Sequence, residues 1–157
     1  MRSDRRQLRA VATAAAACAL GLAGCGSHAA TKQDVIARGN QICDTAAAAV
    51  RAVPPPAGTS TQALARYYEQ VLPIVDKEAS QLQALPRPAQ NRSTLKAYVD
   101  AIAASVTAYH KVVAAAQQGD SGTVASESAK LRASPAAGLA QLYGMTDCAR
   151  SPGTSAS

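Results

Sequence analysis

Residues 95–116, LKAYVDAIAASVTAYHKVVAAA, decide the predicted fold class. Apolar side chains recur there at spacings of four and three residues, which is the repeat of one face of an α-helix. The members of this repeat are Leu95, Val99, Ile102, Val106, Tyr109, Val113 and Ala116, with Tyr98 and Val112 beside them. Gly119 follows as a typical C-cap residue. The stretch therefore predicts a long amphipathic helix with one buried face.

The same repeat predicts a helix over residues 31–53. Thr31 is a candidate N-cap with Asp34 three residues later, an acidic variant of the capping box. The apolar positions are Val35, Gly39, Ile42, Ala46, Ala49 and Val53. Cys43 flanks them, so we expect its side chain at the edge of the core. Pro54–Pro56 end this helix, because proline lacks the N–H that a helix interior requires.

Residues 59–85 predict the next helix, with Thr59 as its N-cap. Its apolar face consists of Leu64, Tyr68, Val71, Val75, Leu82 and Leu85. Pro73 lies inside the pattern on the polar side, which predicts a bend with the proline on the convex face. Pro86 and Pro88 close the segment.

The last helix is predicted in two pieces, over residues 121–133 and 135–143. Its apolar anchors are Val124, Leu131 and Leu142. Ser134 is expected as the N-cap of the second piece, with Pro135 at the first helical position and Gly144 after its end. Four helical segments with short connections favour an all-α, antiparallel up-down-up-down four-helix bundle whose fourth helix is broken by proline. This domain spans residues 31–150, and a disordered tail over 151–157 follows it.

The first 24 residues have the pattern of an export signal. Arginines precede a short apolar run that ends in small residues, and the run from Ala10 to Gly24 is shorter than the ~20 residues of a membrane-spanning helix. Leu22-Ala23-Gly24-Cys25 then resembles the lipobox of bacterial lipoproteins. That resemblance implies cleavage before Cys25 and a lipid on its thiol, with acyl chains such as palmitate. Cleavage for plain secretion is the alternative.

Removal of this signal changes what the composition implies. It takes away four arginines and Asp4, which lowers the formal net charge from +6 to +3. The remaining chain has no cluster of Lys and Arg with interleaved aromatic residues, so the composition argues against nucleic-acid binding. Residues 25–30 would form a short lipidated tether, which at ~3.3 to 3.6 Å per residue keeps the domain close to the bilayer.

Two of the four cysteines remain once Cys18 goes with the signal and Cys25 carries the lipid. An exported protein meets an oxidising environment, so Cys43 and Cys148 are predicted to form a disulfide. Two unpaired buried thiols are the alternative. The chain contains no Phe and no Trp, and a core of smaller side chains buries less apolar area. A disulfide would add stability that such a core does not supply.

Two short segments resemble a pattern in small, alanine-rich lipoproteins of actinobacteria. They are NQICDTA at residues 40–46 and LYGMTDC at residues 142–148. The resemblance implies a helical bundle whose first helix and C-terminal end are joined by the disulfide. Those lipoproteins are largely uncharacterised, so the resemblance implies no activity.

The polar residues show no recognisable catalytic or metal-binding pattern. His28 lies in the tether, and His110 has neither a carboxylate nor another histidine within one helical turn. Asp76 and Glu78 are two residues apart, so on a helix they diverge, and together with Lys77 they are interpreted as a solvated face. No catalytic residue, metal ligand or cofactor is predicted.

The tyrosines offer a different kind of site. Tyr68, Tyr98 and Tyr109 lie on apolar faces, where the simplest role is packing. Alternatively, their hydroxyl groups line a pocket for a small apolar ligand in the bundle core. The sequence thus favours a non-enzymatic lipoprotein that is exported and held by the lipid on Cys25 at the outer face of the cell membrane. It would act there as a binding or interaction module, with an envelope protein or a small apolar ligand as its partner. A carrier of a small apolar ligand and an envelope enzyme are the alternatives.

Overall fold

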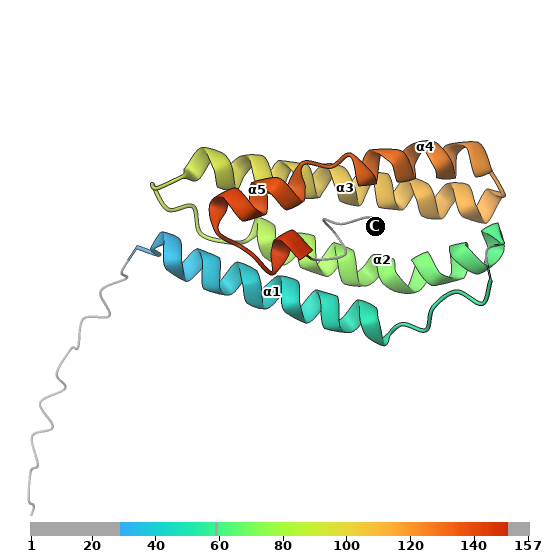
Figure 1. Cartoon of the computed structure of the whole chain (residues 1–157), viewed down its shortest axis with the longest axis horizontal. Coiled ribbons are helices and arrows are strands. Elements are labelled where there is room, and N and C mark those ends of the chain that lie inside the picture. The colour runs from blue at the N-terminus through green and yellow to red at the C-terminus, as the bar shows by residue number, and fades with distance from the viewer. Residues whose placement is uncertain (1–28, 59, 151–157) are drawn as a thin grey trace, which may run out of the picture.

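The chain is a helical bundle in a computed structural model that describes residues 29–58 and 60–150. Its elements are α1 (Lys32–Ala52), α2 (Thr61–Gln83), α3 (Arg92–Gln118), α4 (Ser121–Arg132), α5 (Ala136–Tyr143) and the short 3-10 helix η1 (Cys148–Arg150). The described residues contain no β-strand, which confirms the predicted all-α class. Figure 1 shows α1, α2 and α3 lying side by side along the long axis, with α5 and η1 over one end.

Helix α1 begins with the predicted capping box. Thr31 Oγ1 accepts a hydrogen bond from the Asp34 N–H at 3.2 Å, and Asp34 Oδ2 accepts one from the Thr31 N–H at 2.9 Å. The two bonds satisfy N–H groups that have no partner inside a helix. The Thr31 bonds also hold the pKa of the Asp34 carboxyl below its usual range. Val53 ends the helix in an extended conformation immediately before Pro54.

Helix α2 begins one residue later than predicted. Ser60, not Thr59, is the N-cap, and its Oγ accepts from the Ala63 N–H at 3.2 Å. Thr59 itself lies outside the described residues. Pro73 is exposed within the helix, as its place on the polar side of the pattern predicts.

Helix α3 is the centre of the bundle, because it packs against α2, α4 and α5. Most of its predicted apolar face is buried, namely Leu95, Tyr98, Val99, Ile102, Val112, Val113 and Ala116. The predicted C-cap is confirmed, since Gly119 has a φ of 72° and its N–H bonds to the carbonyl of Ala116. Such a left-handed conformation favours glycine.

The end of the chain folds back over α3. Pro135, not Ser134, is the N-cap residue of α5, so the helix begins one residue later than predicted. The Ser134 hydroxyl accepts a weak bond from the Ala136 N–H at 3.4 Å and lies 2.9 Å from the Ser105 hydroxyl of α3. Gly144 ends α5 with a φ of 106°, as predicted. Leu142 was predicted to anchor this helix in the core, but 73% of its surface is exposed. Tyr143, which is fully buried, takes that role.

Cys43 and Cys148 form the predicted disulfide, with their Cα atoms 5.0 Å apart. Both cysteines are fully buried, so Cys43 lies inside the core and not at its edge as its position beside the apolar repeat had predicted. The Asp147 N–H donates to Asn40 Oδ1 at 3.1 Å, which gives the chain end a second link to α1. The bridge is therefore integrated into the packing between α1 and η1.

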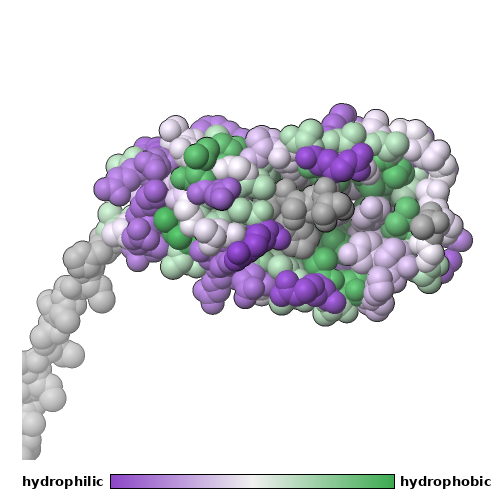
Figure 2. Space-filling view, in the orientation of Figure 1, coloured by the Kyte–Doolittle hydropathy of each residue, from purple (hydrophilic) through white to green (hydrophobic). Residues whose placement is uncertain are grey.

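Two groups of buried side chains make up the core. The larger one surrounds the disulfide and includes Leu82, Leu95, Tyr98, Tyr143 and Met145. The smaller one lies between α3 and α4 and consists of Ala108, Val112 and Leu131. On the face in Figure 2, hydrophilic residues spread widely and hydrophobic ones occupy several small, separate areas. Within the ranges described, no helix has the length and apolar character to cross a membrane.

Candidate functional site

The predicted lipidation site lies outside the described residues. This applies to the whole cleavage motif, Leu22, Ala23, Gly24 and Cys25, to the rest of segment 1–24, and also to the tail over 151–157. These assignments stay predictions.

The three tyrosines of the predicted pocket lie in two places. The rings of Tyr68 and Tyr109 meet edge to face, with 5.9 Å between their centroids, and both pack on the smaller core group. Tyr98 belongs to the larger group, where its hydroxyl lies 3.9 Å from Cys43 Sγ. The structure thus brings Tyr68 and Tyr109 together and places Tyr98 beside the disulfide.

Glu78 was missed by the sequence reasoning. It was interpreted as part of a solvated face, which is wrong, because only 3% of its surface is exposed. Val71, Val75, Glu78 and Leu82 follow the four-three spacing of the buried face of α2. That spacing was the available signal, although a carboxylate is rarely buried.

The charge of Glu78 contributes to the raised pKa values of two tyrosines of α3. Burial raises the pKa of Tyr109 to about 12, and the charges of Tyr68, Tyr67 and Glu78 add to the rise. Burial and, after it, the charge of Glu78 also raise the pKa of Tyr98. A carboxylate therefore lies within electrostatic range of both hydroxyls, in an interior where charges interact more strongly than in water.

Glu78 is also among the residues that line a groove between α1 and α2 of about 210 Å³. The α1 wall consists of Ile42, Thr45, Ala46 and Ala49. The α2 wall consists of Pro73, Ile74, Lys77, Glu78 and Gln81. We call this surface the Glu78 groove. A mostly apolar hollow with few polar groups is the usual form of a small-molecule site.

The Glu78 groove continues into a second hollow of about 250 Å³. The two hollows share Ile42, Thr45, Lys77 and Gln81, and the second adds Arg38 and Gln41. Arg38 and Lys77 are both exposed, so their charges meet solvent at this end. The combined groove therefore has Arg38 in its outer hollow alone, Glu78 in its mostly apolar inner hollow, and Lys77 in both.

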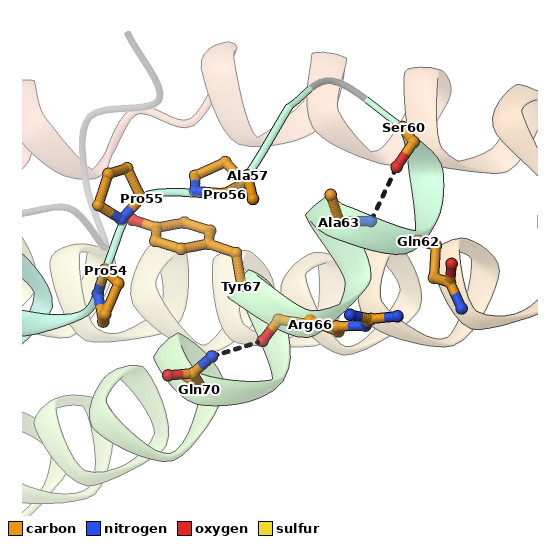
Figure 3. A pocket seen from close by; sticks show the side chains of 10 residues that line it. All are labelled: Pro54, Pro55, Pro56, Ala57, Ser60, Gln62, Ala63, Arg66, Tyr67 and Gln70. Carbon is orange, nitrogen blue, oxygen red and sulfur yellow. Dashed lines mark hydrogen bonds between the residues drawn. The ribbon is translucent and has the colours of Figure 1, made fainter.

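A further hollow lies where the proline segment passes over α2. Figure 3 shows Tyr67 pointing from α2 toward Pro55 and Pro56, in a pocket of about 270 Å³. Two of its polar groups are already bonded locally, because Ser60 caps α2 and the Gln70 amide donates to the Arg66 carbonyl at 3.2 Å. This pocket is better explained as the packing of the connection than as a ligand site.

The largest mostly apolar hollow described, about 440 Å³, lies between α3 and α4. Its walls include four alanines and the nearly buried Glu127, which accepts a hydrogen bond from Lys130 Nζ at 2.6 Å. That bond is the main reason why the pKa of Glu127 is lowered. Glu127 is therefore held in an ion pair with Lys130 at the wall of this hollow.

His110 of α3 has a carboxylate partner on α2, which the residue spacing within its own helix could not indicate. Its Nε2 lies 3.0 Å from Asp76 Oδ1, so α3 and α2 meet at this pair. About half of each side chain is exposed, at 51% for His110 and 42% for Asp76. A solvated pair of this kind links two helices but lacks the water-restricted surroundings that catalysis requires.

The described part of the chain contains no group of three or more His, Cys, Asp and Glu side chains placed to hold a metal ion. Comparison with protein-family models, with curated proteins and with solved structures finds no match to this chain.

Proposed function

We propose that this protein is a lipoprotein that acts as a binding module at the outer face of the cell membrane. The signal pattern of residues 1–24 and the lipobox-like motif ending in Cys25 support export and lipid anchoring. The module engages an envelope protein or a small ligand, has no catalytic role, and belongs with the actinobacterial lipoproteins that it resembles.

The single observation that carries this proposal is the disulfide between Cys43 and Cys148. Disulfides persist in oxidising compartments and are rare in the cytosol. The two bridged cysteines are also the two that remain when Cys18 is assigned to the signal and Cys25 to the lipid. The cysteine chemistry and the signal pattern therefore agree.

The place of the first helix supports a location near the bilayer. Helix α1 begins at Lys32, so residues 25–30 form a tether that spans about 20 Å at most when extended. Two acyl chains give stable attachment, because each buried methylene contributes about 0.8 kcal/mol. The domain, residues 31–150, would then be held within reach of membrane proteins and their ligands.

We also infer that the helices alternate in direction, as an up-down-up-down bundle with a fourth helix broken at Pro135. The connections over 53–60, 84–91 and 119–120 are short, which favours antiparallel neighbours. The course of the colours along α1, α2 and α3 in Figure 1 supports the same order. The end of α4 at Arg132 and the start of α5 at Ala136 support the break.

The anchoring part of the proposal is tested by Cys25→Ser in cells that carry lipoprotein-processing enzymes. We expect this variant to keep its full precursor mass, to incorporate no acyl label and to leave the detergent phase. Cys18→Ser is the matched control and should be processed normally. If Cys25→Ser is processed to the same extent as the wild type and partitions into detergent in the same way, the cysteine is not the anchor.

The binding part is tested by crosslinking on intact cells. Capture of one reproducible partner at the membrane by the anchored chain, and not by Cys25→Ser, would support a binding module. A hydrolase activity that His110→Ala abolishes would instead place the protein among the enzymes.

A further inference from the structure

The start of α1, the connection from α2 to α3 and the end of α5 meet at one end of the bundle (Figure 1). We call this part the tether end and define it as residues 31–36, 84–95 and 139–145. The connections that follow α1 and α3 lie at the opposite end. Because the predicted tether over residues 25–30 immediately precedes Thr31, a lipid on Cys25 would hold the tether end nearest the bilayer.

Three cationic side chains from separate segments gather at the tether end. Lys32 Nζ of α1 lies 5.3 Å from the centroid of the Tyr143 ring. Burial raises the pKa of Tyr143, and the positive charge of Arg87 opposes that rise, which places Arg87 near the same side chain. Arg92 at the start of α3 donates from Nη2 to the Arg87 carbonyl at 3.3 Å. The three cations therefore form one cluster around the end of α5.

The two ends of the bundle differ in charge. The tether end contains these three cations and one carboxylate, that of Asp34, which accepts hydrogen bonds from Thr31 at the start of α1. Figure 2 shows hydrophilic side chains over much of this end. The opposite end, over residues 50–58, 60–70 and 115–121, has two cations and two carboxylates, namely Arg51, Arg66, Glu69 and Asp120. A negatively charged surface would therefore attract the tether end and not the opposite end.

An exposed leucine lies beside the cationic cluster. Leu142 immediately precedes Tyr143 in α5, and 73% of its surface is exposed. Within the described ranges it is the one large apolar side chain that is so exposed. Cations with an adjacent apolar group suit the interface of an anionic bilayer, because the cations attract the headgroup phosphates while the apolar group leaves water.

We propose that the tether end docks on the bilayer that holds the anchor, with its three cations against anionic phospholipid headgroups and Leu142 at the boundary of the acyl chains. This inference rests on the proposed lipid anchor and adds a contact that the folded domain itself makes with the same membrane.

The length of the tether supports the bilayer as the occupant of this surface. The tether spans about 20 Å at most, whereas α3, with 27 residues, is about 40 Å long. The opposite end can therefore reach the membrane only if the bundle lies flat. Each Lys or Arg close to an anionic surface strengthens binding about fivefold, so three cations favour the docked orientation about a hundredfold.

The test uses the full-length chain as cells process it, with the acyl groups on Cys25 measured by mass. The protein is placed in lipid nanodiscs of phosphatidylcholine alone, or of phosphatidylcholine with phosphatidylglycerol as the minor component. A small fraction of the lipid carries a paramagnetic headgroup, which broadens the amide NMR signals of residues near it. We expect Arg92 and Leu142 to broaden several-fold more in the anionic discs, and Arg66 and Asp120 to remain sharp in both.

The lipid comparison separates docking from simple tethering. A tether alone would hold this end near the bilayer equally in both lipids, so the dependence on lipid charge is the decisive measurement. Because exposed charges are screened by salt, the additional broadening should also disappear at about 1 M salt, where the Debye length is about 3 Å.

Two pairs of substitutions locate the contact. Lys32→Gln with Arg92→Gln removes two cations from the tether end and should lower the ratio of docked to undocked protein about tenfold or more. Arg51→Gln with Arg66→Gln is the matched control, because it removes the same charge from the opposite end and should leave docking unchanged. Leu142→Ser should weaken docking up to about tenfold. Circular dichroism establishes that each variant is folded, and if one is not, the lipid and salt comparisons still decide.

Three results would overturn the inference. They are equal broadening in the two lipids, stronger broadening at the opposite end than at the tether end, and an equal loss of docking in the two double variants. A failure of the anchor is measured separately, as missing acyl mass on Cys25. A chain without that mass whose tether end still broadens only with anionic lipid would reject the anchor and keep the docking surface.

Discussion

Gly39 on α1 and Met145 after α5 pack so closely that a Cβ atom on residue 39 would overlap the Met145 sulfur. Both residues are buried, and Met145 is fully so, which leaves its side chain little room to move. Gly39 lies one helical turn before Cys43. The missing side chain therefore lets the end of the chain approach α1 beside the disulfide.

Gly39→Ala should destabilise the protein even though alanine favours helix formation. The collision with Met145 forces the core to rearrange, at a cost of about 1 to 3 kcal/mol. Gly138 in α5 is the matched control, because an added Cβ there meets no atom within 4 Å. Gly138→Ala should stabilise by about 0.5 to 1 kcal/mol. Urea unfolding of the two variants measures both effects. A change of the same sign in the free energy of unfolding of both variants would contradict the claim that residue 39 has no room for a Cβ atom.

Removing the Cys43–Cys148 disulfide should cost about 2 to 5 kcal/mol. The bridge closes a loop with a sequence separation of 105 residues, which restricts the unfolded chain strongly. The double change to serine and the reduced wild type should both melt at lower temperature. Addition of reductant to the serine variant is the control and should have no further effect. An unchanged melting temperature after reduction would show that the bridge adds no stability.

Tyr143→Phe should leave stability unchanged or raise it. The Tyr143 ring is fully buried, and among the described residues its hydroxyl has no hydrogen-bond partner. Such a group costs about 1 kcal/mol or more, so removing it should raise the melting temperature by up to roughly 4 °C. Tyr98→Phe is the comparison, because it removes a hydroxyl that contacts Cys43 Sγ. We expect Tyr98→Phe to lower the melting temperature. If Tyr143→Phe melted at a lower temperature than Tyr98→Phe, the claim that the Tyr143 hydroxyl has no hydrogen-bond partner would be wrong.

Alkaline solution should destabilise the bundle through Tyr109. Its pKa is about 12 in the folded state, raised by burial, and about 10 in an unfolded chain. Between these values the unfolded state has released a proton that the folded state retains. The stabilisation is therefore present below pH 10 and is lost as the pH rises toward 12. At pH 11, Tyr109→Phe should recover about 1 kcal/mol of the loss, measured by urea unfolding at pH 8 and pH 11. An equal loss in both proteins would contradict this role.

The elements of the bundle were largely predictable because their signals are local. The four-three repeat of α3, the capping box of Thr31 and Asp34, and the glycine after α3 each involve residues within a few turns of one another. The disulfide followed from the number of cysteines that remain after export. N-caps are less certain, since Thr59 and Ser60 are neighbours with the same hydroxyl chemistry, and Ser60 caps α2.

The candidate site was not predictable because it depends on packing between helices. The repeat of α2 includes Glu78, but its nearness to the tyrosines of α3 depends on how the two helices pack. The pairing of Asp76 with His110 joins residues 34 positions apart. Which residues of the two helices line the Glu78 groove together depends on how far α1 is displaced along α2, and the eight-residue connection over 53–60 does not fix that offset.

The position of the disulfide also determines how the protein would carry mechanical load. Tension applied between Cys25 and residues beyond Cys148 passes through the first half of α1 and then through the Cys43–Cys148 bond. Residues 44–147 lie inside the covalent loop and bear none of this tension. A pull strong enough to extend the start of α1 would leave α2, α3, α4 and α5 folded, with the inner end of the groove and its buried carboxylate still in place.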